Sequence, residues 1–338
     1  MALPNLSGSD HSAASQLSRR SLLLAALGSV PAMALARESE FPQRPIRLVL
    51  GFPPGGATDN SARLVAQKMA EFLGQPIVVE NRPGASGNIA AEAVARSAPD
   101  GYTLFYTTST IHGINPNVFA KLPYDPVKDF EPVLFVSRTL MVLLVRNDLG
   151  VTSTRELIQL AKSKPGKLTY ASAGLGSTQH LAGALFCSKA GIDALHVPYK
   201  GSSQALTDLM SGQVDFVIDT LSASLPFVRG GKLRALAVSG LERSSVLKDL
   251  PTIDGEGVPG YNVAAWGGFL VPKGTPASII RTFNAAGNQA IQSPEVVSRA
   301  GATGSELKGG TPKEFGDFIR QELATWKLAV AAAGVPKQ

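Results

Sequence analysis

Short apolar runs alternate with amphipathic stretches along most of the chain, and this alternation limits the folds that it can adopt. Each apolar run is long enough for a strand, and each stretch between two runs is long enough for a helix. Such an order favours parallel or mixed sheets with helices on both faces, which is an α/β fold. Strands are predicted over residues 46–50, 77–80, 102–106, 141–145, 168–171, 214–218, 233–238 and 268–271.

The predicted helices follow from apolar spacing and from capping signals. In the first helix, Ala62, Val65 and Met69 share one face. Ser153 and Glu156 have the spacing of a capping box at the start of another. Further helices are predicted over 177–190 and 202–211 and after Pro276 and Pro312, the last with Phe315, Ile319, Glu322 and Trp326 on one side.

The first 36 residues have the pattern of an export signal. Arg19 and Arg20 precede an apolar core over 22–30 that is too short to span a bilayer, and small residues end at Ala36. We predict cleavage near Ala36 and a periplasmic mature protein of 302 residues (338 − 36 = 302). The paired arginines resemble a twin-arginine signal but also occur in ordinary signals, so both export routes stay open, as does an uncleaved anchor.

The mature length and the absence of a low-complexity linker predict two lobes joined by chain crossovers rather than two domains in tandem. We expect the chain to leave the first lobe near residue 140 and to return near residue 262. Lobe 1 then comprises residues 37–140 plus 262–338, and lobe 2 comprises residues 141–261.

Charge and cysteine content narrow the possible partners. The chain carries a net charge of +6 with scattered lysines and arginines and no basic run, so nucleic acid is not expected as a partner. The single cysteine, Cys187, excludes an internal disulfide and lies in an apolar helical pattern that favours burial. No segment after the signal is apolar enough to cross a membrane, so contact with a membrane would be peripheral only.

No motif in the chain indicates catalysis or metal binding. There is no G-x-S-x-G nucleophile elbow and no H-E-x-x-H zinc motif, and the mature chain has His112, His180 and His196 in separate segments. We therefore predict no catalytic residues, no metal and no cofactor. An exported enzyme that uses His180 or His196 remains the remote alternative, while a packed, hydrogen-bonded His180 is the simpler interpretation.

Two Gly-rich turns between a strand and a helix are predicted to bind an anion. The start of a helix carries free backbone N–H groups and a partial positive charge, so such a turn takes a carboxylate without an arginine. The first turn lacks the P-loop lysine. The predicted ligand contacts are Phe52, Pro54, Gly55, Gly56, Ala57 and Asp59 in the first turn and Gly87 and Asn88 in the second.

A third turn and three further positions complete the candidate site. Ser177 and Thr178 are natural N-caps, so capping is the alternative role for their hydroxyls. Asp219 ends a predicted strand at the edge where α/β proteins bind ligands, and beside an anion it would need a water, a ligand amine or hydroxyl, or its own proton. The predicted contacts here are Ser172, Gly174, Ser177, Thr178, Tyr199, Gly201 and Asp219.

A series of segments, in this order, resembles the Bug (Bordetella uptake gene) family, whose members are extracytoplasmic solute receptors of tripartite tricarboxylate transporters. The segments are 41–46, 51–59, 80–87, 98–104, 122–126, 164–168, 170–172, 180–183, 196–201 and 231–238. They cover nearly all of the mature chain. The resemblance implies a type II-like periplasmic-binding-protein fold with two crossovers, and a ligand held by the turns described above. Thr108 and Ser109 lie in the stretch 107–112, where ligand-selecting residues are expected.

These observations predict a receptor that captures a small carboxylate between its lobes and docks on the membrane subunits of the transporter. The ligand is a mono-, di- or tricarboxylate or an amino acid, and the sequence does not select among them. A receptor that presents its ligand to a membrane signalling partner is the alternative, which neighbouring genes would distinguish. A monomer is the default state.

Overall fold

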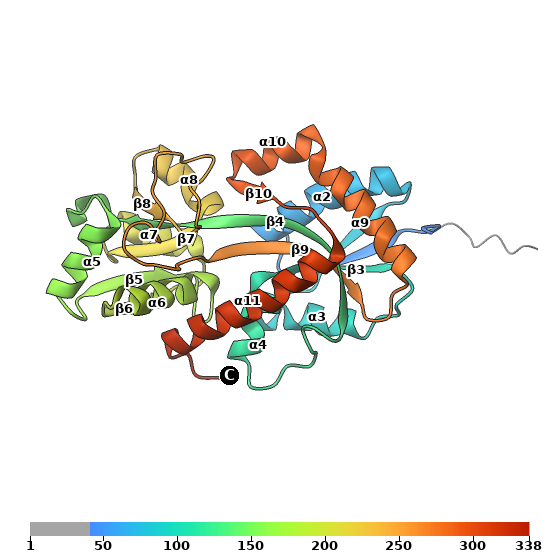
Figure 1. Cartoon of the computed structure of the whole chain (residues 1–338), viewed down its shortest axis with the longest axis horizontal. Helices are drawn as coiled ribbons and strands as arrows, with labels where there is room; N and C mark the ends of the chain where they lie inside the picture. Colours follow the sequence, from blue (N-terminus) through green and yellow to red (C-terminus); the bar gives the residue numbers. More distant parts are fainter. Residues whose placement is uncertain (1–40, 338) are drawn as a thin grey trace, which may run out of the picture. The chain divides into compact units, whose positions relative to one another are not determined.

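Ten strands of the computed structural model join in one mixed sheet, in the order β2-β1-β3-β9-β4-β7-β5-β6, with β10 and β8 both paired to β4 (Figure 1). The structure describes residues 41–337, so the predicted export signal and the cleavage near Ala36 lie outside the described residues. The strands are β1 (Ile46–Leu50), β2 (Ile77–Asn81), β3 (Thr103–Thr108), β4 (Phe130–Val145), β5 (Leu168–Ser172), β6 (Ala194–Pro198), β7 (Phe216–Thr220), β8 (Arg234–Val238), β9 (Ala264–Pro272) and β10 (Ser305–Leu307).

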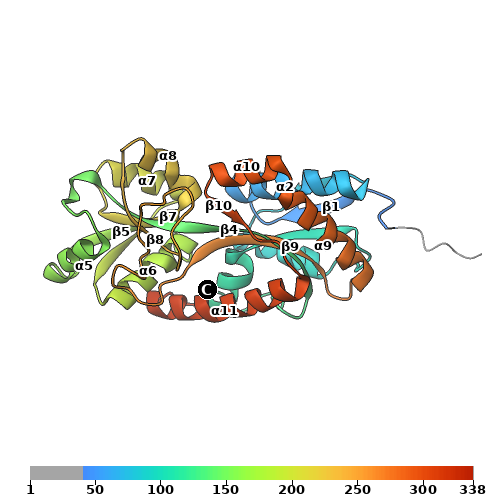
Figure 2. The same ribbon diagram turned by 45° about the horizontal axis from the view of Figure 1, so that its top comes forward.

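Helices cover both faces of the sheet, as the alternating sequence predicts (Figures 1 and 2). They are α2 (Ala57–Leu73), α3 (Asn88–Ala95), α4 (Asn115–Val118), α5 (Thr154–Ser163), α6 (Thr178–Ala190), α7 (Ser202–Met210), α8 (Leu221–Arg229), α9 (Ala277–Gln292), α10 (Pro294–Ala302) and α11 (Pro312–Ala333). The short helices η1 (Ala85–Gly87), η2 (Ser109–Ile114) and η3 (Asn147–Leu149) connect them. Across residues 41–337, no helix combines the length and the apolar character that a membrane span requires.

Strand β4 joins two groups of strands. Over Phe130–Leu140 it pairs antiparallel with β9, and from Met141 to Val145 it pairs antiparallel with β7. On one side of this junction β1, β2 and β3 run parallel, and on the other side β5, β6 and β7 run parallel. Because parallel strands end at the same edge of a sheet, the turns that follow each group are gathered at one place.

The sequence prediction missed the first part of β4 and the whole of β6 and β10. In β4 the pairing register shifts between Pro132 and Leu134 and again between Phe135 and Ser137, so the apolar alternation is broken. The strand β6 is the last in the sheet and only partly buried, which leaves it without an apolar run. The predicted Ser153–Glu156 pattern is half right, because Ser153 caps α5 but the Glu156 carboxylate accepts from Thr152 instead.

Helix α11 packs against both groups of strands and runs past both in Figures 1 and 2. Phe315 and Ile319, near its start, belong to a core cluster with residues of β3 and β9. Trp326 and Ala329, near its end, belong to the cluster around β5 and α6. The predicted apolar side of this helix is therefore confirmed, and it buries one continuous stripe across two cores.

Glu322 is the one acidic residue on the buried side of α11. Its carboxylate accepts from the indole Nε1 of Trp266 on β9 at 2.6 Å and from Nε1 of Trp326 at 2.8 Å. Burial raises the pKa of Glu322 above its ordinary value, against the lowering effect of the two indole donors. The carboxylate thus ties α11 to β9 beside the junction of the two strand groups.

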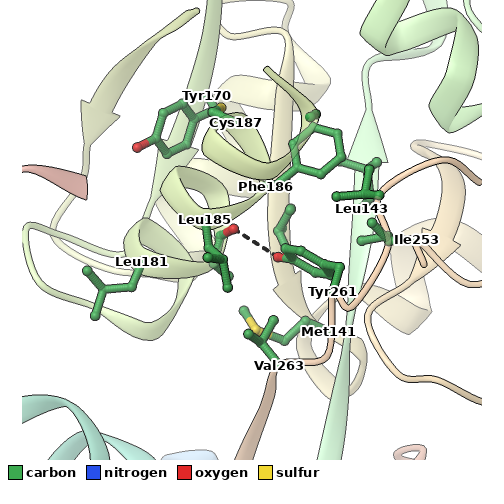
Figure 3. Close-up of a cluster of buried hydrophobic side chains, with 14 of the residues drawn as sticks. Met141, Leu143, Tyr170, Leu181, Leu185, Phe186, Cys187, Ile253, Tyr261 and Val263 are labelled. Atoms are coloured by element: carbon green, nitrogen blue, oxygen red, sulfur yellow. Dashed lines mark hydrogen bonds between the residues drawn. The ribbon is translucent and has the colours of Figure 1, made fainter. Parts of the chain in front are cut away.

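The core next to α6 is closed by Tyr261, which is fully buried between β4 and α6 (Figure 3). Its hydroxyl donates to the backbone oxygen of Ala182 at 2.8 Å, which supplies the partner that a buried hydroxyl requires. Cys187 lies in the same cluster, and burial raises the pKa of its thiol to about 12. The predicted apolar role of Cys187 is therefore confirmed.

Candidate ligand-binding site

The turns after β1 and β2 meet at a contact between two glycines. A Cβ atom on Gly51 would lie 2.8 Å from the Cα of Gly87, closer than real Cβ atoms come to a neighbour. Gly87 also has a φ of 90°, which a residue with a side chain rarely adopts. The backbones therefore touch directly, and the starts of α2 and α3 are brought to the same edge.

Helices α2 and α3 both begin at glycines without a side-chain cap. Gly56 is the N-cap of α2 and Gly87 is the N-cap of α3, and neither start receives a side-chain hydrogen bond. Gly56 and Ala57 are exposed. The first N–H groups of a helix have no partner within the helix, so the start of α2 offers exposed donors and a partial positive charge.

Asp59 lies in the first helical turn of α2 and holds the Gly-rich turn after β1 by hydrogen bonds. Its carboxylate accepts from Arg63 Nε at 2.8 Å, from Asn81 Nδ2 at 2.9 Å and from the Gly55 amide at 3.0 Å. The hydrogen bond from Arg63 is the main reason that the pKa of Asp59 falls to about 2. The Gly55 amide is therefore already bonded, and the structure gives Asp59 a positioning role.

We expect Asp59→Asn to lower the free energy of unfolding at pH 7 by about 1–2 kcal/mol. Solvent screening keeps this change small, because the Arg63 side chain is half exposed. A depressed folded-state pKa stabilises the fold above the unfolded value of 3.8, and this contribution is lost as the pH falls toward 2. Urea unfolding of both proteins between pH 7 and pH 2 checks this. The gap between them should close below pH 4, and a gap that does not depend on pH would contradict the assignment.

Asn88, Thr108 and Ser109 lie beside the same edge. The side-chain Oδ1 of Asn88 accepts from Asn115 Nδ2 at 2.7 Å and from the Tyr124 hydroxyl at 2.7 Å, so this oxygen holds the fold together. Thr108 ends β3, and its buried Oγ1 has no partner within residues 41–337. Ser109 opens η2, a π-helical segment of a kind that often occurs at functional sites.

The third turn is closed by its own side chains. Ser172 Oγ accepts from the Gly174 amide at 3.1 Å and lies 2.7 Å from His196 Nε2. Ser177 is the N-cap of α6 and accepts from the His180 amide at 3.2 Å, which is the predicted capping alternative. Thr178 follows it and is buried. The amides of Gly176 and Ser177 are also bonded within the turn and the start of α6, so the amides of this turn are largely used inside the protein.

Tyr199 and Gly201 follow β6 and adjoin the third turn. The Tyr199 amide donates to the Ser172 carbonyl oxygen at 3.0 Å, and the Tyr199 carbonyl oxygen would lie 3.2 Å from a Cβ on Gly174. Burial raises the pKa of the Tyr199 hydroxyl to about 12. Gly201 is the N-cap of α7 and provides no side-chain cap.

Asp219 lies at the meeting point of three helix starts. Its Oδ1 accepts from Gln179 Nε2 at 3.0 Å and from the Thr220 amide at 2.6 Å, and its Oδ2 accepts from the Ser202 hydroxyl. These donors come from the starts of α6, α8 and α7. Burial raises the pKa of this fully buried carboxyl group. The protein's own carboxylate thus occupies the position where helix starts favour negative charge.

Two groups of predicted residues therefore form, one after β1, β2 and β3 and one after β5, β6 and β7. They approach each other through η2 and α4, where Gly176 lies against Val118 and η2 contacts α6. No hydrogen bond between the two groups is found among the described residues. Asn81, Tyr124, Gln179 and Ser202 contribute to these groups but were not predicted. Their side chains reach partners far apart in sequence, so local patterns carry no signal for them.

One cavity lies away from the predicted residues, and a second borders the third turn through Leu175. One, of about 680 Å³, lies between β8 and residues 246–250. The other, of about 530 Å³, lies between α6, β6 and the C-terminal end of α11. Within residues 41–337, no three His, Cys, Asp or Glu side chains are grouped as metal ligands would be.

Solved structures with the same fold define the class of protein. A Rhodopseudomonas palustris protein with adipate, Rpa4515, is 39% identical, with a TM-score of 0.79, over 88% of this chain and 100% of its own. MatC of the same organism, with bound malate, is 35% identical, with a TM-score of 0.74, over 86% and 100%. The periplasmic binding protein BugD is 33% identical, with a TM-score of 0.75, over 88% and 100%. The fold is thus that of a periplasmic solute-binding protein.

The family follows from the sequence profile. The profile described as "Tripartite tricarboxylate transporter family receptor" matches residues 61–335. The chain therefore belongs to this family of receptors, which includes the Bug proteins, and the resemblance seen in the sequence is confirmed. The family consists of solute-binding receptors and not of enzymes, in agreement with the prediction.

Proposed function

We propose that the protein binds a small organic carboxylate between two lobes and delivers it to the membrane subunits of a tripartite tricarboxylate transporter. The observation that carries this proposal is the exposed, uncapped start of α2 at Gly56 and Ala57, which the contact of Gly51 with Gly87 sets beside the start of α3. Exposed amides of this kind stabilise a carboxylate without a buried cation. The adipate and malate of the solved relatives have this chemistry.

The lobes in this proposal are residues 37–140 plus 262–338 and residues 141–261. The change of partner of β4 at Leu140 and Met141, and the start of β9 at Ala264, support these boundaries. Closure by hinge motion would bring the Gly201 start of α7 toward the first two turns. Asp219 then positions three helix starts and does not itself bind the acid, which removes the repulsion expected between two carboxylates.

Export to the periplasm, with cleavage near Ala36, completes the proposal. The solved relative BugD is a periplasmic binding protein, which supports this location. Docking on membrane subunits accords with the family description. We take the receptor to act as a monomer and to contact the membrane only through those subunits.

Thermal melting of protein refolded to remove any carried ligand tests the proposal. An acid at a hundredfold excess over its dissociation constant should stabilise the fold by about 2.7 kcal/mol, which raises Tm by several degrees. Adipate and malate are the first ligands to test, each beside its neutral diamide as a matched control. A diamide lacks the negative charge that helix starts attract, so it should give no shift. Equal shifts from acid and diamide, or no shift with any small carboxylate, would contradict the proposal.

A further inference from the structure

Thr108 carries a buried hydroxyl that makes no hydrogen bond among residues 41–337. It is the last residue of β3, and only 7% of its surface is exposed. The hydroxyl of Thr107, the residue before it, lies 2.5 Å from His112 Nδ1 and is therefore satisfied within the fold. A buried hydroxyl without a partner costs free energy, so a hydrogen-bond partner from outside the protein would be stabilising at Thr108.

The side chain of Thr108 lies on the face of the sheet that α2 covers. Thr108 has an extended backbone (φ −138°, ψ 167°), so its side chain points to the same side as that of Tyr106, two residues earlier. Tyr106 belongs to the core cluster that contains Val65 and Met69 of α2. The Tyr106 hydroxyl also lies 3.0 Å from Ser61 Oγ in the same helix. Thr108 therefore faces α2.

Gly267 of β9 places Thr108 beside the contact between Tyr106 and Ser61. Gly267 is the cross-strand neighbour of Thr108, and a Cβ atom on Gly267 would overlap the Tyr106 hydroxyl. Side chains of directly opposite residues start about 5 Å apart, so the Thr108 side chain and the Tyr106 hydroxyl lie at the same level of α2. Ser61 is only partly buried, so this level of the helix is not closed off from solvent.

The exposed start of α2 lies one helical turn beyond this level. Ala57 precedes Ser61 by four residues, which is about 6 Å along the helix axis. The start of α2 offers exposed amides to a carboxylate, and Thr108 offers a hydroxyl donor roughly one turn away. These two donor sets are too far apart for the two oxygens of a single carboxylate. They match two separate oxygen-bearing groups of one small acid.

We propose that the ligand is an acid with a second oxygen acceptor about 6 Å from the carboxylate that the start of α2 holds, and that this acceptor receives the hydrogen bond of the Thr108 hydroxyl. Short dicarboxylates have such a second group, whereas alkyl monocarboxylates do not. Thr108 is then a specificity-determining residue. This inference rests on the proposed function and narrows it to one class of acid.

Titration of paired acids tests the assignment. The pairs are adipate with hexanoate and malate with 2-hydroxybutyrate, and the members of each pair differ only in the second carboxylate. Thr108→Val removes the hydroxyl and keeps the shape of the side chain. It should weaken binding of the dicarboxylate roughly tenfold, because a hydrogen bond to a charged group is lost, and change binding of the monocarboxylate less than about twofold. Thr108→Ser keeps the donor and should keep the affinity for the dicarboxylate within about threefold.

Stability measurements separate this role from a structural one. Because the Thr108 hydroxyl has no partner in the described fold, Thr108→Val without ligand should unfold at the same urea concentration as the wild-type protein or at a higher one. Thr154→Val on α5 is the matched control. It also removes a buried hydroxyl without a partner among residues 41–337, and it should leave the affinity for both dicarboxylates unchanged.

Three results would overturn this inference and leave the proposed function intact. They are wild-type affinity of Thr108→Val for the dicarboxylates, equal affinity of the wild-type protein for the two members of each pair, and a marked loss of stability in Thr108→Val without ligand. Failure of the wild-type protein to bind any of the four acids would overturn the inference and the proposed function together.

Discussion

Asp219→Leu should destabilise the protein by about 2–5 kcal/mol, because it leaves three partly buried donors without an acceptor. The donors are Gln179 Nε2, the Thr220 amide and the Ser202 hydroxyl, and each belongs to the start of a different helix. Their loss would free the starts of α6, α7 and α8 together. Urea unfolding measures the change.

Asp219→Asn is the matched control for this prediction. Its Oδ1 can still accept from Gln179 and Thr220, and its Nδ2 can donate to the Ser202 hydroxyl, which then acts as an acceptor. The amide also removes a buried charge, so we expect a change within about 1 kcal/mol of zero. A loss with asparagine as large as that with leucine would show that the charge, rather than the hydrogen-bond geometry, holds the three helices.

Gly87→Ala should cost about 2–4 kcal/mol and weaken binding of the acid. The added Cβ would lie 2.7 Å from the Ile111 side chain, at a residue whose φ is 90°. The strained backbone and the overlap each contribute, and overpacking alone typically costs 1–3 kcal/mol. Relief of the clash would move the start of α3 away from Ile111 of η2 and disturb the turn beside the start of α2, so the acid should lose affinity as well.

Gly74→Ala is the control that separates backbone strain from steric overlap. Gly74 has a φ of 66° at the end of α2, and no atom lies within 4 Å of the position of an added Cβ. This substitution should therefore cost only the backbone term of about 1–2 kcal/mol and leave acid binding unchanged. Urea unfolding and ligand titration of both variants make the comparison. Equal stability losses for the two would mean that the close approach at Gly87 is unimportant.

Local patterns were sufficient where one element carries its own signal. The strand 46–50 and the stripe of Phe315, Ile319 and Trp326 are apolar at the correct period, and the structure confirms both. The first part of β4 and the edge strand β6 lack such a period. Each becomes a strand because a neighbouring strand supplies its backbone partners, which is a property of the assembled sheet.

The candidate site likewise has a part that the sequence predicts and a part that only the tertiary structure shows. Glycine content and position after a strand placed the turns, and the structure gathers them at the strand ends in two groups. The sequence could not assign Asp219, because its donors lie at residues 179, 202 and 220 and meet only when three helices start at one edge. Nor could it show that the Gly55 and Gly174 amides are already bonded.

The order of apolar and amphipathic segments was thus enough to predict an α/β fold with Gly-rich turns, because secondary structure and turn chemistry depend on neighbours in the chain. Tertiary structure decided which polar groups satisfy each other and which stay free for a ligand. The physical reason is that hydrogen bonds and backbone contacts act over a few ångströms, whereas the groups bonded to Asp219 lie as far as forty residues from it in the sequence.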